Sequence, residues 1–379
     1  MVYIAFSYLG LICLGFIDNA RGPVYPQILH YFQITKAEGS LIFSVASLAS
    51  FMIAIPAKKW VKSIGIINAT KLALLLDAIA CIGYSYCPPT REGYNLLILF
   101  SLLFGLGVGL KSISLNLIIN VAYVGPHKRK VFSGLHSMYG ISSLLAPQIV
   151  NLLYLQGYSW NIVFRFMAIF PLITFLYFIK LKPKAVKLPE AHEDGNLPLS
   201  LIAAMGILLS FYVASEIIVS SRLVLFLQEV HGYSESLSSI YLSLFFGGLL
   251  AGRLFFSFKE VSLSSLSLLK ISALTTICLV LLGTQYHPVF LSLCGLSMSF
   301  FFPCAMSFIS EHFSQMADLL MARSMQIVGF SLVSFHYVFG LISTYSTVES
   351  AMLLPVLLLG ISSAIMFFDR RLVEVWGRD

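Results

Sequence analysis

Residues 95–122 read NLLILFSLLFGLGVGLKSISLNLIINVA, a run in which Lys111 is the only charged side chain. The hydrocarbon core of a membrane is about 30 Å thick, and a helix needs about 20 apolar residues to cross it. The run is therefore long enough to span a membrane. Similar runs recur on both sides of it, so we expect an integral membrane protein built from helices.

Eleven further apolar runs are separated by glycine, proline and charged residues. The twelve predicted spans are residues 3–30, 38–57, 66–87, 95–122, 131–154, 160–180, 197–228, 235–257, 262–284, 287–312, 321–345 and 351–368. Twelve spans use about 240 residues, and the chain has 379. Little is left for a soluble catalytic, nucleotide-binding or nucleic-acid-binding domain, which excludes an ATP-driven pump that acts alone.

The composition agrees with this prediction. Hydrophobic residues make up 58% of the chain and charged residues 11%, whereas soluble domains carry about 25% charged residues. The net charge is +7, but the basic residues lie in short loops between apolar runs, as membrane topology requires. We therefore expect a lipid bilayer around the chain and no nucleic acid as a partner.

The segment KLKPKAVKLPEAHEDGN, residues 180–196, is the one long polar stretch and divides six spans from six. The predicted domains are a bundle of residues 1–179, this linker, a bundle of residues 197–368 and a tail of residues 369–379. Fifteen of the 24 basic residues fall in the loops and tail on the side of the N-terminus, and only Lys36 and Arg91 fall in the opposite loops. This bias places both termini and the linker in the cytoplasm, and the protein in a plasma membrane, which is the inner membrane in a bacterium.

The two halves resemble each other. A shift of 198–200 residues lays Asp18 on Glu216, and it lays the motif HSMYG, which begins at His136, on HYVFG, which begins at His336. We therefore expect two six-helix bundles related by a parallel repeat. Such bundles leave a central cleft near the middle of the membrane, and rocking them exposes the cleft to each side in turn.

Six plus six spans, a basic linker and cytoplasmic termini resemble the major facilitator superfamily over the whole chain. This resemblance implies a transporter that works as a monomer, without a cofactor, and not an enzyme. Motifs typical of intramembrane enzymes, such as H-E-x-x-H and G-x-S-x-G, do not occur in the sequence. The loop PAKKWVKSIG, residues 56–65, keeps the basic residues of the superfamily's loop signature but lacks its acidic residue.

Three segments are similar to the fucose/galactose symporter-like branch: YVASEIIVSS at 212–221, FGGLLAGRLFF at 246–256 and HSMYGISSLLAP at 136–147. This similarity implies sugar transport by symport with a proton or sodium. Lys111 falls about where the fucose transporter of this branch carries an acidic residue. Together with Arg21 and Arg222 it keeps open an alternative, an exporter or importer of an organic anion or an amphipathic drug-like solute.

Ionisable residues inside the spans are candidate functional residues, because each costs at least about 2.5–3.5 kcal/mol at the centre of a bilayer. Asp18 and Arg21 are three residues apart and share one helix face, as a structural ion pair or as a substrate and proton site. Glu216 has no cation within four residues and is the predicted proton carrier, with a structural bond to Arg253 or Arg222 as the alternative.

Lys111 is a candidate for contact with the substrate in the cleft, and a salt bridge with Asp18 is the alternative. We expect Lys111 and Asp18 to lie close in space, since opposite charges on neighbouring helices offset part of each other's desolvation. Asp77, Lys71 and Lys270 lie on spans that are peripheral in the superfamily and are interpreted as structural or snorkelling. The six cysteines lack the spacing of a metal site, so no metal is expected. Further candidates for contact with a polar substrate are Asn116, His136, Tyr139, Tyr212, Gln326 and His336.

Overall fold

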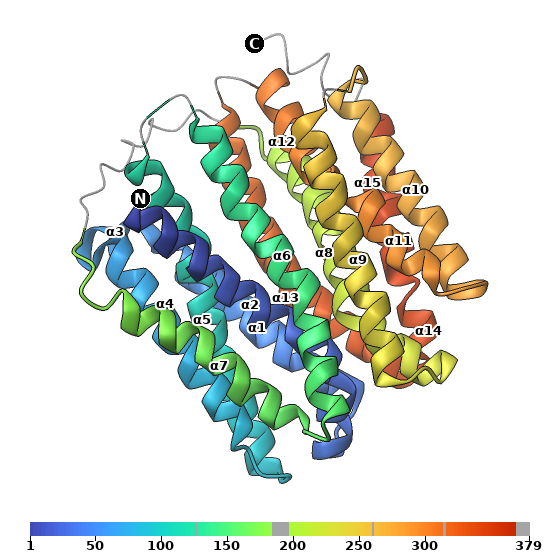
Figure 1. Cartoon of the computed structure of the whole chain (residues 1–379). Coiled ribbons are helices and arrows are strands. Elements are labelled where there is room, and N and C mark those ends of the chain that lie inside the picture. The colour runs from blue at the N-terminus through green and yellow to red at the C-terminus, as the bar shows by residue number, and fades with distance from the viewer. Residues whose placement is uncertain (124, 126, 184–196, 260, 314–315, 369–379) are drawn as a thin grey trace. The chain divides into compact units, whose positions relative to one another are not determined.

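The structure is a computed structural model, and it describes residues 1–123, 125, 127–183, 197–259, 261–313 and 316–368. Within these residues all regular structure is helical, and twelve spans are long and apolar enough to cross a membrane (Figure 1). The predicted all-α membrane fold is therefore confirmed. The predicted linker, apart from residues 180–183, and the predicted tail lie outside the described residues.

The helices follow the predicted spans closely. They are α1 (Val2–Phe32), α2 (Lys36–Ala54), α3 (Ala57–Ser63), α4 (Gly65–Ser85), α5 (Arg91–Ala122), α6 (Lys128–Leu155), α7 (Trp160–Tyr177), α8 (Leu199–His231), α9 (Glu235–Phe258), α10 (Ser265–Gln285), α11 (Val289–Met298), α12 (Phe301–His312), α13 (Ala317–Tyr345), α14 (Val348–Ala351) and α15 (Leu354–Phe368).

Two spans are broken where the sequence predicted continuous helices. The tenth span divides into α11 and α12 just before Pro303, and the twelfth divides into α14 and α15 just before Pro355. A proline has no N–H to donate to the carbonyl four residues earlier, and its ring clashes with that carbonyl. The prolines therefore account for both breaks.

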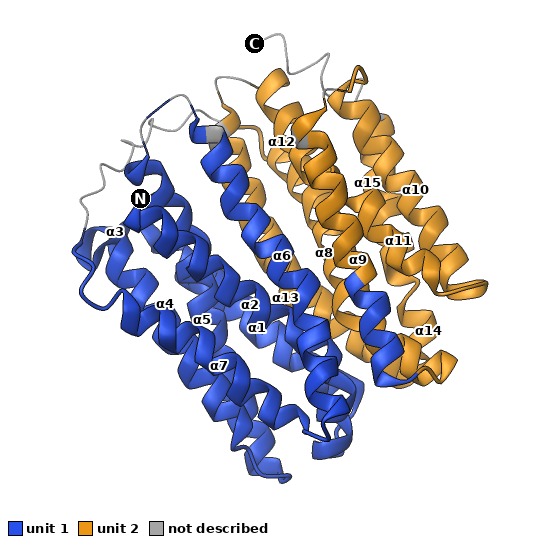
Figure 2. Ribbon diagram, viewed as in Figure 1, with its two compact units in different colours: residues 1–189, 234–243 blue, residues 190–233, 244–379 orange. Residues whose placement is uncertain are grey.

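The chain forms two compact units (Figure 2). Unit 1 comprises Met1–Pro189 and Ser234–Ser243, and unit 2 comprises Glu190–Tyr233 and Leu244–Asp379. The first turns of α9 thus cluster with unit 1, where Gln148 Nε2 donates to Ser243 Oγ at 2.9 Å.

In unit 1, α5 packs against α2 and α4, and α1 packs against α6 and α7. Gly105 and Gly109 lie four residues apart on α5 and face α2, where a side chain would collide with the backbone of Ala46 or Ser50. Small residues at this spacing let membrane helices approach closely. The two glycines therefore let α5 pack closely on α2.

In unit 2, α8 packs against α13 and α15, and α9 approaches α11 through Gly248 and Gly252. The break between α11 and α12 frees backbone carbonyls, which must find donors inside the protein, because lipid offers none. Tyr212 donates its hydroxyl to Met298 O, and Ser272 donates to Ser297 O at 2.6 Å. The break is therefore supported by side chains of α8 and α10.

The helix ends support the internal repeat. Helix α1 ends at Gln33 (φ 51°) and α8 ends at Gly232 (φ 64°), both left-handed and 199 residues apart. Helix α2 begins at Lys36 and α9 at Glu235, again 199 residues apart. This offset lies within the shift of 198–200 residues that aligns Asp18 with Glu216.

Candidate functional site

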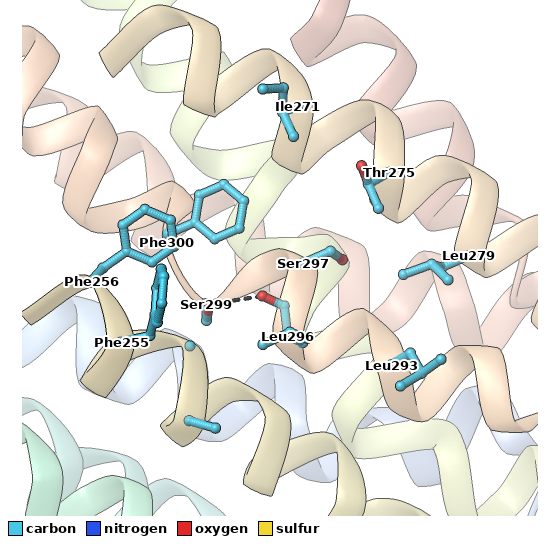
Figure 3. A pocket seen from close by; sticks show the side chains of 12 residues that line it. Phe255, Phe256, Ile271, Thr275, Leu279, Leu293, Leu296, Ser297, Ser299 and Phe300 are labelled. Atoms are coloured by element: carbon cyan, nitrogen blue, oxygen red, sulfur yellow. Dashed lines mark hydrogen bonds between the residues drawn. The ribbon is translucent and has the colours of Figure 1, made fainter. Parts of the chain in front are cut away.

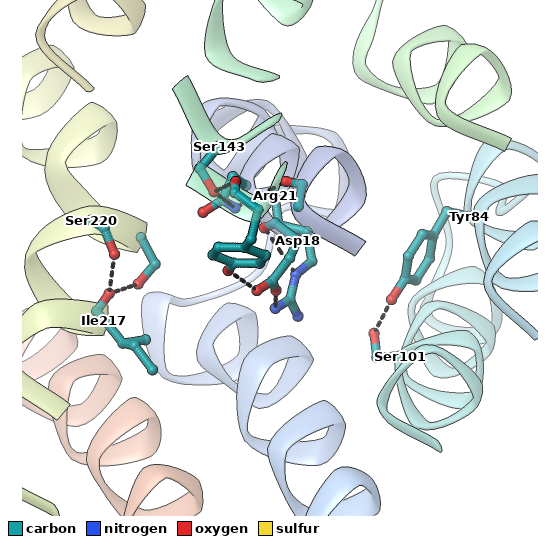
Figure 4. A network of polar contacts seen from close by, with 11 residues as sticks. Asp18, Arg21, Tyr84, Ser101, Ser143, Ile217 and Ser220 are labelled. Atoms are coloured by element: carbon teal, nitrogen blue, oxygen red, sulfur yellow. Dashed lines mark hydrogen bonds and ion pairs between the residues drawn. The ribbon is translucent and has the colours of Figure 1, made fainter. Parts of the chain in front are cut away.

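Three predicted site residues meet in unit 1 (Figure 4). Arg21 Nη2 forms an ion pair with Asp18 Oδ1 on the same face of α1, and the Tyr139 hydroxyl on α6 donates to Asp18 Oδ2 at 3.0 Å. The side chains of Asp18 and Arg21 remain 27% and 12% exposed. We call these residues the Asp18 cluster; it presents an acceptor, a donor and an aromatic ring together.

Aromatic rings hold the guanidinium of Arg21. Its central carbon lies 4.9 Å from the centre of the Phe43 ring and 4.7 Å from that of Phe104. A cation over a ring face is stabilised by about 0.5–2 kcal/mol. Arg21 Nη1 is buried and has no hydrogen-bond partner among the described residues.

A small cavity beside Arg21, of about 10 Å³, is lined also by Tyr25, Phe43, Tyr84 and Phe164. Such a volume holds about one water molecule. The Asp18 cluster thus includes one hydrogen-bond donor without a partner among the described residues, Arg21 Nη1, and aromatic side chains lie beside it.

Lys111 pairs with Asp77 on α4, so the alternative of a salt bridge to Asp18 is wrong, whereas the expected closeness of Lys111 and Asp18 stays a prediction. Both side chains are fully buried, which agrees with the structural role predicted for Asp77 and not with snorkelling. Gly107 on α5 lies opposite, and a Cβ atom there would come within 2.5 Å of Asp77 Oδ1. The glycine leaves room for the carboxylate between the two helices.

Glu216 in unit 2 has a partner, Arg253 on α9, with 3.6 Å between Arg253 Nη2 and Glu216 Oε1. This was the alternative that the sequence left open. The two residues lie on different helices, α8 and α9, so spacing along the sequence could not decide between Arg253 and Arg222. Their side chains are 20% and 33% exposed, so the pair keeps a solvent-accessible or lipid-accessible side.

The remaining predicted residues are spread over both units. Tyr212 is fully buried, donates to Met298 O and stacks on Phe301 with 3.5 Å between ring centres. The Asn116 amide donates to Ser112 O of its own helix at 2.7 Å. His336 is buried, whereas His136 and Gln326 are exposed. Tyr212 therefore packs in the interior of unit 2, and the contact of the other four residues with a solute stays a prediction.

Several polar contacts between distant segments were not predicted. In unit 1, Gln27 Nε2 donates to Glu235 Oε1 at 2.6 Å, and Asn19 Nδ2 donates to Ser143 Oγ at 2.8 Å. Gln27 and Asn19 lie on α1, as do Asp18 and Arg21. No spacing in the sequence signals them, because each joins residues more than 100 positions apart.

A groove of about 670 Å³ lies in unit 2, between α9, α10 and the break after α11 (Figure 3). Its lining is apolar apart from hydroxyls such as Ser299, which donates to Leu296 O at 2.7 Å. None of the described residues that line it is a predicted site residue. The groove offers apolar surface and little that could orient a polar solute.

Among the described residues, no three His, Cys, Asp or Glu side chains gather as they would around a metal ion.

A profile of the Major Facilitator Superfamily matches residues 7–332. The chain belongs to this superfamily. A curated relative in Saccharomyces cerevisiae, Bypass of stop codon protein 6, is 23% identical over 163 residues. The match covers 43% of this chain and 31% of that protein, so this chain spans less than a third of the length of the curated relative that it matches.

Solved structures of superfamily transporters have the same fold. A bacterial homolog of the human lysosomal transporter Spinster is 14% identical, with a TM-score of 0.77 over 98% of this chain and 97% of that chain. The xylose transporter XylE from E. coli is 13% identical, with a TM-score of 0.76 over 96% and 94%. The transporter FucP is 16% identical, with a TM-score of 0.65 over 97% and 98%. At these identities the similarity shows the fold alone.

Proposed function

We propose that this protein is a secondary active transporter that moves a small polar solute by alternating access, in symport with protons, and that the solute is a sugar. The observation that carries the proposal is the Asp18 cluster, which holds a carboxylate, a guanidinium and a phenol inside a membrane-spanning bundle. Such groups are costly in a membrane and mark solute or ion pathways.

The cluster suits a sugar because a sugar hydroxyl both donates and accepts hydrogen bonds. Asp18 accepts from a hydroxyl, Arg21 Nη1 donates to one, and Tyr139 offers a ring face. Solved relatives described as a D-xylose-proton symporter and a fucose:proton symporter add support at the level of the fold. We include His136, Asn116, Gln326 and His336 as further contacts in this proposal.

For coupling, we assign the proton to the two repeat-related acids, Glu216 and Asp18. Each has an arginine partner and a side chain that is still partly exposed. A carboxylate that exchanges an arginine for a proton can link proton movement to a change of conformation. Sodium coupling is the competing outcome, and replacing a pH gradient by a sodium gradient distinguishes them.

A second candidate solute is an organic anion or an amphipathic drug-like molecule, moved as an export or import cargo. The observation that favours it is the buried Arg21 Nη1, which lacks a hydrogen-bond partner among the described residues. A carboxylate of the cargo would satisfy this donor and add charge pairing.

A thermal-shift screen of purified protein tests the choice of solute. A ligand at 100 times its Kd stabilises the folded state by about 2.7 kcal/mol, so sugars, carboxylates and lipophilic cations can be ranked directly. We expect a sugar to raise the melting temperature of the wild type and not of Asp18→Asn. Stabilisation by carboxylates alone would favour an organic anion as the solute. Stabilisation by none of these classes would contradict both candidate solutes.

We further propose that the protein works as a monomer in a plasma membrane, with both termini in the cytoplasm. The two functional domains in this proposal are residues 1–179 and 197–368. Reporter domains fused to each terminus test the orientation, and both reporters should be active on the cytoplasmic side alone.

A further inference from the structure

We propose that Asp77 is a proton-binding site inside unit 1, and that a proton on its Oδ1 atom opens the ion pair with Lys111. The proposal concerns residues that the proposed coupling through Glu216 and Asp18 does not use. Its consequence for transport rests on the proposed function, but the protonation itself does not.

The first support is the geometry of the carboxylate. Oδ2 forms the ion pair with the ammonium of Lys111. Oδ1 is buried, and no described residue donates a hydrogen bond to it. A buried oxygen left without a donor carries the full desolvation cost of that atom. Protonation of Oδ1 removes the charge that makes this burial costly. Gly107, whose missing side chain leaves space beside Oδ1, keeps that oxygen clear of α5.

The second support is the set of charges around Asp77. Lys111 faces it from α5, Asp18, Arg21 and Cys13 lie on α1, which contacts both α4 and α5, and Cys81 lies on α4 itself. The other neighbours of α4 contribute charges that are engaged elsewhere or exposed. On α7, Arg165 donates to Ser85 Oγ at 3.2 Å, and the lysines of α3 are exposed: Lys58, Lys59 and Lys62.

These neighbours make a balanced group of charges. Asp18 and Asp77 carry two negative charges, and Arg21 and Lys111 carry two positive charges. A proton on Asp77 leaves Asp18 as the one negative charge of this group, which removes the repulsion between the two acids and also ends the charge pairing of Asp77 with Lys111. A hydronium ion gives its proton to Oδ1 and becomes water, Lys111 keeps its three protons, and the ion pair between Nζ and Oδ2 is reduced to a hydrogen bond with a neutral acid.

The consequence reaches the Asp18 cluster. Once Asp77 is neutral, Lys111 lacks its counter-ion, and Asp18 is the other acid of the group. Attraction between Lys111 and Asp18 would compete with Arg21 and with the hydrogen bond from Tyr139 on α6. Proton binding at Asp77 and solute binding at Asp18 therefore influence each other, and the influence is reciprocal.

A purely structural pair predicts something else. Removing one partner of a buried pair is strongly destabilising, but replacing both is often neutral or stabilising. If the pair only holds α4 to α5, a double variant without either charge should keep both fold and pH response. If Asp77 binds a proton, the same variant should keep the fold and lose part of the pH response.

Infrared difference spectroscopy between acidic and alkaline buffers tests the proton directly in the purified protein. We expect a carboxylic-acid C=O band in the wild type that is lost in Asp77→Asn and in Asp77→Asn/Lys111→Gln. The matched control is Glu38→Gln/Arg91→Gln, which removes an exposed ion pair between α2 and α5 with 2.5 Å between Arg91 Nη1 and Glu38 Oε1. The control should keep the band. A band of unchanged intensity in both Asp77 variants overturns the proposal.

Counterflow exchange at a series of pH values tests the consequence. Where the wild-type rate changes about ten-fold over one pH unit, the double Asp77/Lys111 variant should change less than about three-fold. If the double variant keeps the wild-type pH profile, the pair is structural, and proton binding at Asp77 does not influence the Asp18 cluster. If the Asp77 variants lose the infrared band but the wild-type protein transports no solute, Asp77 is still a proton-binding site, and the proposed transport function is contradicted instead.

Discussion

Lys111 and Asp77 form an ion pair in which neither side chain has exposed surface. The pair joins α5 to α4, two neighbouring helices of unit 1, and both helices also contact α1, which carries Asp18 and Arg21. A charged pair at this position is costly to build, because both ions leave water, and costly to break, because either ion alone would be uncompensated. Its variants therefore separate structural from functional roles.

Lys111→Met should destabilise the protein by about 3–5 kcal/mol, because it leaves a buried carboxylate without its partner. Asp77→Asn/Lys111→Met should recover most of that loss. Thermal unfolding in detergent measures both. Equal destabilisation by the single and the double variant would show that packing of the lysine stem matters more than its charge.

Tyr139→Phe should weaken solute binding while the fold is kept. The change removes the hydroxyl that donates to Asp18 Oδ2 at 3.0 Å and leaves the ring in place. Loss of one hydrogen bond costs about 0.5–1.5 kcal/mol, which corresponds to a rise in Kd of about two-fold to twelve-fold. Binding isotherms of the best solute for both proteins measure this. An unchanged Kd would remove Tyr139 from the site.

Tyr212→Phe should act on stability rather than on binding. The hydroxyl of Tyr212 supports the carbonyl of Met298 at the break in the tenth span, and an unsatisfied buried acceptor costs about 1–3 kcal/mol. We expect a lower melting temperature and an unchanged Kd. The reverse pattern, an unchanged melting temperature and a raised Kd, would return Tyr212 to the solute site.

The sequence was sufficient for the spans and the superfamily fold, because each span carries its own signal in its length and hydrophobicity. It also indicated the pairing of Asp18 with Arg21, since three residues make less than one helical turn. The break before Pro303 could have been predicted from the proline, but a proline within a membrane helix is also tolerated as a kink.

Contacts between helices were harder to predict, as Lys111 shows. The choice between Asp18 and Asp77 depends on the rotation of α4 and α5 about their axes, and apolar residues all round a membrane helix leave no stripe that fixes this rotation. The same holds for Glu216 and Arg253. A glycine opposite an acid, as Gly107 is opposite Asp77, was the one local signal, and it could be interpreted only once the helices were placed.

Glu216→Gln should abolish accumulation of solute under a pH gradient and leave counterflow exchange intact, because exchange needs no net movement of protons. Arg253→Gln is the matched control, since it removes the other half of the pair. Asp18→Asn should reduce both activities through loss of its pair with Arg21. If Glu216→Gln and Arg253→Gln impair exchange equally, the pair is structural and Glu216 is not the carrier.

The most direct test of the central claim is a recording of external pH when solute is added to weakly buffered proteoliposomes that contain the purified protein. The solute is the best stabiliser from the thermal-shift screen. Symport predicts that the outside becomes more alkaline as solute and protons enter together, and that Glu216→Gln abolishes the signal. Uptake of labelled solute without any change of pH would contradict proton-coupled transport.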